Sequence, residues 1–317
     1  MTQGYLRTKG VRASTTAISK LQQQVDPQAF NTRLRGVKVL NPVPYRADYF
    51  GHKLHLDQNE KLVMYGVFQV ACIDGYSSQI IKHVVLPEKN NVLIYDKLFK
   101  PILDEKGVWS MLRTDHGTEF ALVQFAQNMF QGYRLSTEGL PFVQSYSKNN
   151  LRIERWWVEV NHRVNYPIKK FLRDMEENGS LIYRNDTRWF IVGEFCRRVC
   201  EIGIERLVNS WNAHTVPHRG VPNDLETPVG VVSEDIPTGT VLANEYVRLG
   251  GSITRPGATH SIYDEVLADA RDSHFFSVAG GFEDIYGFVM ANRFDLFQSC
   301  LHEYVNLTQQ YLPVEEA

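Results

Sequence analysis

Three acidic residues, Asp57, Asp115 and Glu154, stand in apolar or aromatic surroundings. Asp115 lies in the stretch RTDHGTEF, between the apolar run 108–112 and a turn at Gly117. Carboxylates that are brought together away from water repel one another, and their burial is costly unless a cation compensates their charge. Mg²⁺ prefers such oxygen ligands, and two ions held by carboxylates can stabilise an in-line phosphoryl transfer. If the fold brings the three acids together, they predict a metal-dependent phosphoryl-transfer site.

Other residues whose types could support catalysis or metal binding have simpler structural interpretations. Asp74 directly precedes a glycine, and the pair Asp-Gly between two apolar runs is typical of a hairpin turn. Cys196 and Cys200 lie four residues apart on an expected helix with no histidine at ligand spacing. We therefore interpret them as core thiols and not as zinc ligands. The chain has only four cysteines, too few for a disulfide framework, which favours a reducing compartment.

The order of the expected elements indicates an α/β fold. The β-branched and aromatic content and the spacing of three segments predict three antiparallel strands at the start of the core, and helices then alternate with two further strands. A strand that follows a crossover helix should lie parallel to its neighbour. This order is that of an RNase H-like, mixed five-stranded sheet flanked by helices. The expected strands are 54–58, 62–74, 78–86, 108–112 and 141–146, and the expected helices are 91–105, 118–131, 149–175 and 186–211.

Such a sheet would bring the three acids to one edge. Asp57 would lie inside the first strand, and Asp115 would lie at the C-terminal end of the fourth strand, where open α/β sheets bind ligands. Glu154 would lie in the first turns of a helix that packs across the same edge. The acids would then converge from three distant parts of the chain.

The two ends of the chain differ in charge. Residues 1–50 carry eight Lys/Arg and two Asp/Glu, whereas residues 231–317 carry four Lys/Arg and 13 Asp/Glu. The difference predicts separate surfaces for separate partners, although solvated faces without a partner are the alternative. Near the N-terminus, Ser14 or Thr15 is expected to cap a helix. We divide the chain into a remnant of a helix-turn-helix (1–30), a basic linker (31–50), a core (51–230) and an acidic, mostly helical C-terminal extension (231–317).

Four sequence motifs resemble the DDE integrase core of retroviral and transposon origin. They are HLD (55–57), YGVFQVACIDGYSSQII (65–81), RTDHGTEF (113–120) and NNLRIERWW (149–157), and the last two look most like an animal lineage related to Ginger-type transposons. The resemblance implies that Asp57, Asp115 and Glu154 form the catalytic triad and bind Mg²⁺ or Mn²⁺. It also implies that a homo-oligomer in the nucleus cleaves and joins double-stranded DNA, with transposon ends and target as substrates. No segment has the length of a membrane span, so we expect no membrane partner.

The sequence departs from retroviral integrases next to two of the acids. His116 follows the second acid, where those enzymes usually have Asn, and Trp157 and Val158 occupy the turn where they place Asn and Lys. These departures concern contacts with DNA ends more than the metal site. Basic residues that flank the acids or belong to the basic linker are candidates for phosphate binding, with ordinary surface charge as the alternative. The candidates are Arg33, Arg35, Lys38, His116, Arg152 and Arg155.

Two functions from different classes remain open at this point. The intact set of acids favours a metal-dependent DNA strand transferase. The near-neutral core and the acidic extension favour a domesticated, transposon-derived protein that binds DNA or protein without transposition. Aromatic residues concentrated in the extension, between 275 and 304, also predict that it mediates self-association, with docking onto its own core as the alternative.

Overall fold

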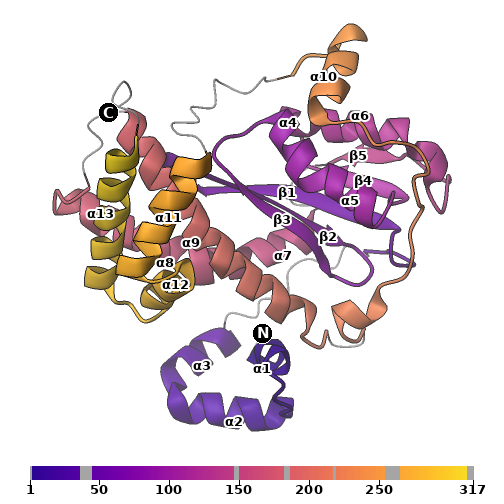
Figure 1. The fold of residues 1–317 in the computed structure, drawn as a ribbon. Coiled ribbons are helices and arrows are strands. Elements are labelled where there is room, and N and C mark those ends of the chain that lie inside the picture. The colour runs from indigo at the N-terminus through magenta and orange to yellow at the C-terminus, as the bar shows by residue number, and fades with distance from the viewer. Residues whose placement is uncertain are drawn as a thin grey trace.

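A mixed five-stranded sheet forms the centre of the protein. The computed structural model describes residues 2–35, 45–145, 150–181, 186–216, 219–253 and 265–312. The strands are β1 (Lys53–Leu62), β2 (Val67–Asp74), β3 (Ile80–Leu86), β4 (Met111–Thr114) and β5 (Phe142–Gln144), in the order β3-β2-β1-β4-β5. β1, β2 and β3 pair antiparallel, whereas β4 lies parallel to both β1 and β5. The expected α/β, RNase H-like sheet is therefore confirmed (Figure 1).

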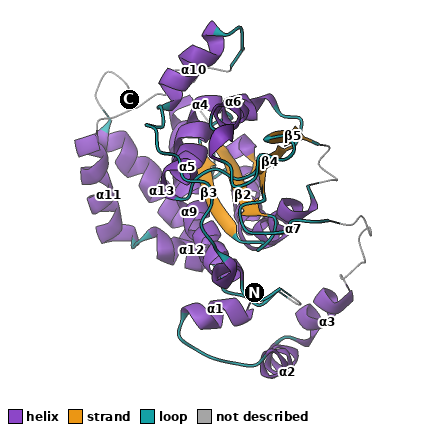
Figure 2. Cartoon of the chain, turned by 90° about the vertical axis from the view of Figure 1, so that its right-hand side faces the viewer, coloured by secondary structure: helices purple, strands orange, loops and turns teal. Residues whose placement is uncertain are grey.

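Helices cover both faces of this sheet (Figures 1 and 2). None of the described helices combines the length and apolar character that crossing a membrane requires. One face carries α4 (Asn91–Ile94), a π-helical turn (Tyr95–Phe99), α5 (Lys100–Glu105) and α6 (Ala121–Met129). The other face carries α7 (Leu151–Val160), a second π-helical turn (Asn161–Asn165), α8 (Tyr166–Glu177) and α9 (Asp186–Asn212).

Alternation along the two central strands separates the two cores. On β2, Phe68, Val70 and Cys72 pack beneath α4–α6, whereas Ala71 and Ile73 pack against α7–α9. Successive side chains of a strand point to opposite faces, so a two-residue period fixes this division. The same period on β1 sends Leu54 and Leu56 to the first core. The polar side chains of His55, Asp57 and Asn59 thereby face α7, which is what positions the site described below.

The expected strand limits hold only approximately, and the second and fourth expected strands include residues that form other structure. The segment 62–74 is not one strand, because Val63–Tyr65 forms a 3-10 turn that ends at Gly66 in a left-handed conformation (φ 68°). The fourth strand begins at Met111 and not at Val108, whose amide donates instead to the carbonyl of Gly230. Val108 and Trp109 are buried beside the sheet, so their apolar character reflects burial and not pairing with β1 or β5.

The N-terminal segment forms three helices, α1 (Thr2–Thr8), α2 (Thr15–Val25) and α3 (Pro27–Arg35). Ser14 caps α2 as expected, since its hydroxyl accepts a hydrogen bond from the amide of Ala17 (3.1 Å). α1 packs on the end of α9, where a Cβ on Gly4 would lie 1.9 Å from the carbonyl oxygen of Ser210. α3 continues through residues 31–35, so the first part of the expected basic linker is helical. The rest of the expected linker up to residue 44 lies outside the described residues.

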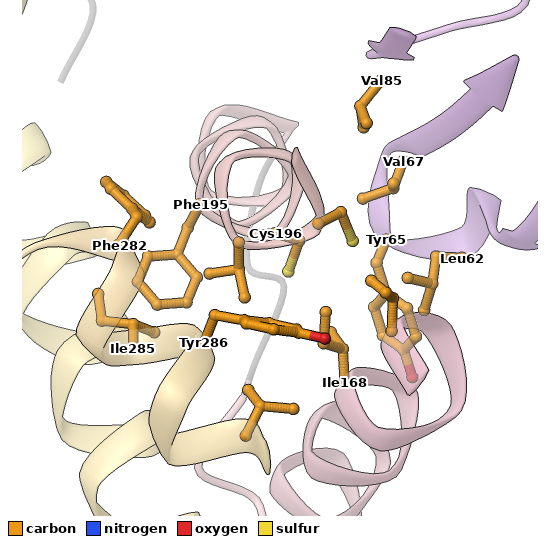
Figure 3. Packing of buried hydrophobic residues seen from close by; sticks show 14 of the residues in the cluster. Leu62, Tyr65, Val67, Val85, Ile168, Phe195, Cys196, Phe282, Ile285 and Tyr286 are labelled. Carbon is orange, nitrogen blue, oxygen red and sulfur yellow. The ribbon is translucent and has the colours of Figure 1, made fainter. Parts of the chain in front are cut away.

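The C-terminal extension packs on the core through four helices. α10 (Gly239–Arg248) lies on α4 and α6, and Leu242 and Ala243 join their core. The other three are α11 (Glu265–Ala279), α12 (Phe282–Met290) and α13 (Phe294–Tyr311), and they pack on α8 and α9. Figure 3 shows Phe282, Ile285 and Tyr286 meeting Phe195 of α9.

Most aromatic residues of the extension are therefore covered within the chain. Phe275, Phe297 and Tyr304 are fully buried, whereas Phe276 keeps 42% of its surface exposed. Docking onto the core, the alternative to self-association, accounts for these side chains. The aromatic residues thus no longer argue for a second chain, and self-association stays a prediction without that support.

Candidate active site

Asp57 is a buried carboxylate at the centre of the sheet. It lies in β1 and faces α7, and its side chain is 5% exposed. The indole Nε1 of Trp157 donates a hydrogen bond to its Oδ2 (3.1 Å). Burial raises the pKa of Asp57 to about 7, and the negative charges of Glu154 and Asp115 add to this shift, while the amide of Gln58 and the indole of Trp157 oppose it. Asp57 therefore lies within electrostatic reach of both other acids.

Asp115 directly follows the last residue of β4, so it lies at the C-terminal end of the fourth strand, as expected. Its Oδ1 is buried, yet it accepts no hydrogen bond from any residue that the structure describes. Buried polar atoms in proteins are nearly always paired, with protein groups, water or an ion. An oxygen in this position is suited to bind a cation.

Glu154 reaches the same site from α7. Its side chain is half-buried, one turn into the helix. Burial raises its pKa, the charge of Asp115 raises it further, and Lys61 opposes the shift. The structure therefore brings together all three acids that the sequence singled out, from β1, from the end of β4 and from α7.

A series of polar contacts aligns α7 with β1. At the start of α7, Asn150 bonds to His55 and to the carbonyl of Leu56. At its far end the π-helical turn continues the series, since Asn59 donates to Asn161 (2.8 Å). Asn165 exchanges hydrogen bonds with Gln69 of β2 (2.8 and 3.0 Å).

These aligning residues escaped the sequence analysis. Their signal was present, because positions 55, 57 and 59 share one face of a strand and positions 157, 161 and 165 share one face of a helix. Burial of so many amide groups is tolerated only because they bond to one another.

The three acids suit a divalent ion, although they do not form a closed coordination shell. Within the described ranges, no three Asp, Glu, His or Cys side chains are placed to hold one ion together. Mg²⁺ does not require this, since it commonly binds through one or two carboxylates and keeps several waters. Oδ1 of Asp115, which has no described hydrogen-bond partner, fits such an ion. So do the pKa values of Asp57 and Glu154, which burial raises and the charge of Asp115 raises further.

Basic side chains gather beside the acids. Burial lowers the pKa of Arg152, and the positive charges of Arg219 and Arg155 contribute. The guanidinium of Arg152 lies 4.7 Å from the ring centre of Tyr45 and donates to Ser78 (3.1 Å). None of these three arginines forms an ion pair with a carboxylate among the described residues. A cluster of cations that have no described carboxylate paired with them suits an anionic ligand.

The other DNA-binding candidates are placed only in part. His116 and Arg155 are exposed and flank the acids. Arg33 and Arg35 belong to α3, but their side chains are not described, and Lys38 lies outside the described residues.

Asp74, Cys196 and Cys200, which the sequence assigns structural roles, have structural contacts. The carboxylate of Asp74 accepts five hydrogen bonds, from the amides of Gly51, Tyr76 and Ser77, the hydroxyl of Ser77 and the indole of Trp109. Cys196 and Cys200 are buried in the core as free thiols, and burial raises the pKa of both. The hairpin and core-thiol interpretations are therefore confirmed.

Comparison with known protein families gives one match. A family model described as an integrase core domain covers residues 45–231, which include all five strands, α7–α9 and the three acids. No curated protein matches the chain. The resemblance to Ginger-type elements stays a prediction. Since the family model spans more than half of the chain and the strand order agrees with it, this chain belongs to the integrase core domain family and carries a retroviral-integrase-like core.

Proposed function

We propose that this chain cleaves and transfers DNA strands with Mg²⁺ or Mn²⁺ held by Asp57, Asp115 and Glu154. Membership in the integrase core family supports polynucleotidyl transfer as the class of reaction. The observation that carries the proposal is the buried Oδ1 of Asp115, which no described group satisfies. Beside it lie two acids whose pKa values are raised by burial and, to a smaller extent, by neighbouring negative charge. A site that concentrates negative charge in this way is suited to a divalent cation.

The residues of the chain then have separate tasks. Asp57 and Asp115 are fixed by the sheet, and Glu154 is brought to them by the contacts between α7 and β1. The bound ions would stabilise the charge that develops on the attacking and leaving oxygens of a phosphodiester. Arg152 and Arg155, next to Glu154 on α7, would hold the DNA backbone by charge-assisted hydrogen bonds.

A matched pair of acid variants tests the proposal. Asp115→Asn removes a ligand charge, whereas Glu119→Gln changes an acid four residues later that pairs with Lys89 (3.2 Å). Nicking and joining of labelled DNA should require Mn²⁺ or Mg²⁺ and stop with EDTA. Asp115→Asn should reduce both by at least about 100-fold while Glu119→Gln remains within a few-fold. Metal-dependent activity that survives in Asp115→Asn would refute the assignment.

A domesticated, DNA-binding protein without transposition is the second candidate. The near-neutral charge of the core and the acidic C-terminal extension favour it. It predicts salt-sensitive DNA binding that neither EDTA nor Asp115→Asn changes, together with no strand cleavage. Either function would place the protein with DNA in the nucleus.

A further inference from the structure

Two adjacent tryptophans on α7 differ in what their indole nitrogens contact. Trp156 and Trp157 are both buried, with 0% and 4% of their surfaces exposed. The Nε1 of Trp157 donates to Oδ2 of Asp57 (3.1 Å). The Nε1 of Trp156 has no hydrogen-bond partner among the described residues, and its ring packs edge-on against Trp211. Only one of the two indole N–H groups is therefore engaged by the site.

An indole N–H is suited to orient a metal-binding carboxylate. It donates one hydrogen bond in a fixed direction, and it can neither accept a proton nor bind a cation. It therefore limits rotation of the Asp57 carboxylate without competing for an ion. Carboxylates that bind metals are typically held by such hydrogen bonds, and loss of one commonly weakens metal affinity by about 10- to 100-fold.

Trp157 lies between two residues of the same helical segment that also contribute to the site or contact β1. It lies three residues after Glu154, on the helix face that looks toward β1. Further along that face, Asn161 bonds to Asn59, two residues beyond Asp57 on the same strand. On the other side of the indole, Asn150 bonds to the carbonyl of Leu56, so contacts before and after Trp157 hold it in register with Asp57. The ring itself is packed in the core.

We propose that Trp157 is a positioning residue that orients the Asp57 carboxylate for divalent-ion binding. The inference rests on the proposed function, because it concerns the same ion. It assigns to the tryptophan a role distinct from packing, and it predicts that the two neighbouring tryptophans respond differently to the same substitution.

The test compares Trp157→Phe with Trp156→Phe in the full chain. Both variants keep a buried aromatic ring and lose one indole N–H, so packing losses are matched. Mn²⁺ binding, measured from the electron paramagnetic resonance signal of the free ion, should weaken about 10-fold or more in Trp157→Phe and less than about 2-fold in Trp156→Phe. The Mn²⁺ concentration for half-maximal strand cleavage should rise in parallel, whereas the rate at saturating Mn²⁺ should fall less.

A second measurement on the wild-type chain applies even where a variant folds poorly. The chain has five tryptophans, and ¹⁵N-labelled indole groups give one N–H resonance each. Mg²⁺ should shift the resonance of Trp157 while that of Trp156 stays in place, and Asp57→Asn should abolish the shift. Equal Mn²⁺ affinities in the two variants, or a Trp157 resonance that does not respond to Mg²⁺ in an active protein, would overturn the inference alone. A wild-type chain that neither binds Mn²⁺ nor cleaves DNA would refute the proposed function and this inference with it.

Discussion

His55 and Asn150, which are 95 positions apart in the chain, are joined by a hydrogen bond of 2.5 Å. The amide nitrogen of Asn150 also donates to the carbonyl of Leu56 (3.1 Å), so its oxygen accepts from the Nδ1–H of His55. The Nε2 of His55 in turn accepts from the hydroxyl of Tyr45 (2.7 Å). Burial lowers the pKa of His55 to about 4, so the imidazole is neutral at physiological pH. One amide thus ties the start of α7 to the strand that carries Asp57.

Replacing this amide should damage both the fold and the site. Asn150→Ala leaves the Nδ1–H of His55 and the carbonyl of Leu56 buried without partners, at about 1–3 kcal/mol for each group. We expect urea unfolding to show a loss of about 2–4 kcal/mol and DNA cleavage to fall, because Glu154 is no longer held against β1. The control is Asn209→Ala, an exposed position on α9, which should change stability by less than about 0.5 kcal/mol. Equal stabilities of the two variants would show that the hydrogen bonds of Asn150 to His55 and Leu56 do not stabilise the fold.

Asp57 should make the metal-free protein less stable as the pH rises. Its pKa is raised from 3.8 to about 7 in the folded chain, so folding disfavours its ionised form. The stability associated with its protonated form is complete below about pH 4 and is lost as the pH rises toward 7. Asp57→Asn cannot ionise and should therefore stabilise the chain in EDTA at pH 8, by on the order of 2 kcal/mol, and have little effect at pH 4.

Asp74→Asn is the matched control for this prediction. The Asp74 carboxylate accepts five hydrogen bonds, and an amide offers a single acceptor oxygen to the same donors. The substitution should therefore destabilise the chain by more than about 2 kcal/mol at either pH. Urea unfolding in EDTA at pH 4 and pH 8 distinguishes the two acids. A loss of stability in Asp57→Asn at pH 8 would contradict the assignment of Asp57 as a strained, ion-binding carboxylate.

DNA affinity should depend on the basic cluster of the core as well as on the N-terminal segment. Each phosphate contact adds about 0.9 to the slope of log affinity against log salt concentration. Arg155→Ala and Arg219→Ala should each reduce this slope by about one, because both side chains are exposed and lack a described carboxylate partner. Arg173→Ala, which removes an exposed arginine paired with Glu177 on α8, should leave it unchanged. Slopes that change only when residues 1–35 are removed would place the contacts in the N-terminal helices.

The sequence predicts the sheet and the three acids because both depend on local signals. The β-branched and aromatic content of β2 and the strand-ending position of Asp115 are properties of short segments. Contacts between segments that are distant in the chain have no such local signal in the sequence. No local pattern around Asn150 identifies His55 as its hydrogen-bond partner. Val108 and Trp109 have the composition of a strand, although the amide of Val108 donates to Gly230 and not to a strand of the sheet. The helical part of residues 31–35 is not predicted, because their basic composition is typical of a linker.

The C-terminal extension should behave as part of the core and not as a separate assembly element. Phe297 of α13 is fully buried, with its ring 5.3 Å from that of Phe171 and 5.6 Å from that of Phe195. Phe297→Ala opens a cavity there and should lower the free energy of unfolding by about 3–5 kcal/mol. Phe276→Ala, at a ring that is 42% exposed, should cost less than about 1 kcal/mol. Light scattering should give the same mass for the wild type and for Phe276→Ala, and a lower mass for Phe276→Ala would restore the extension as a contact between chains.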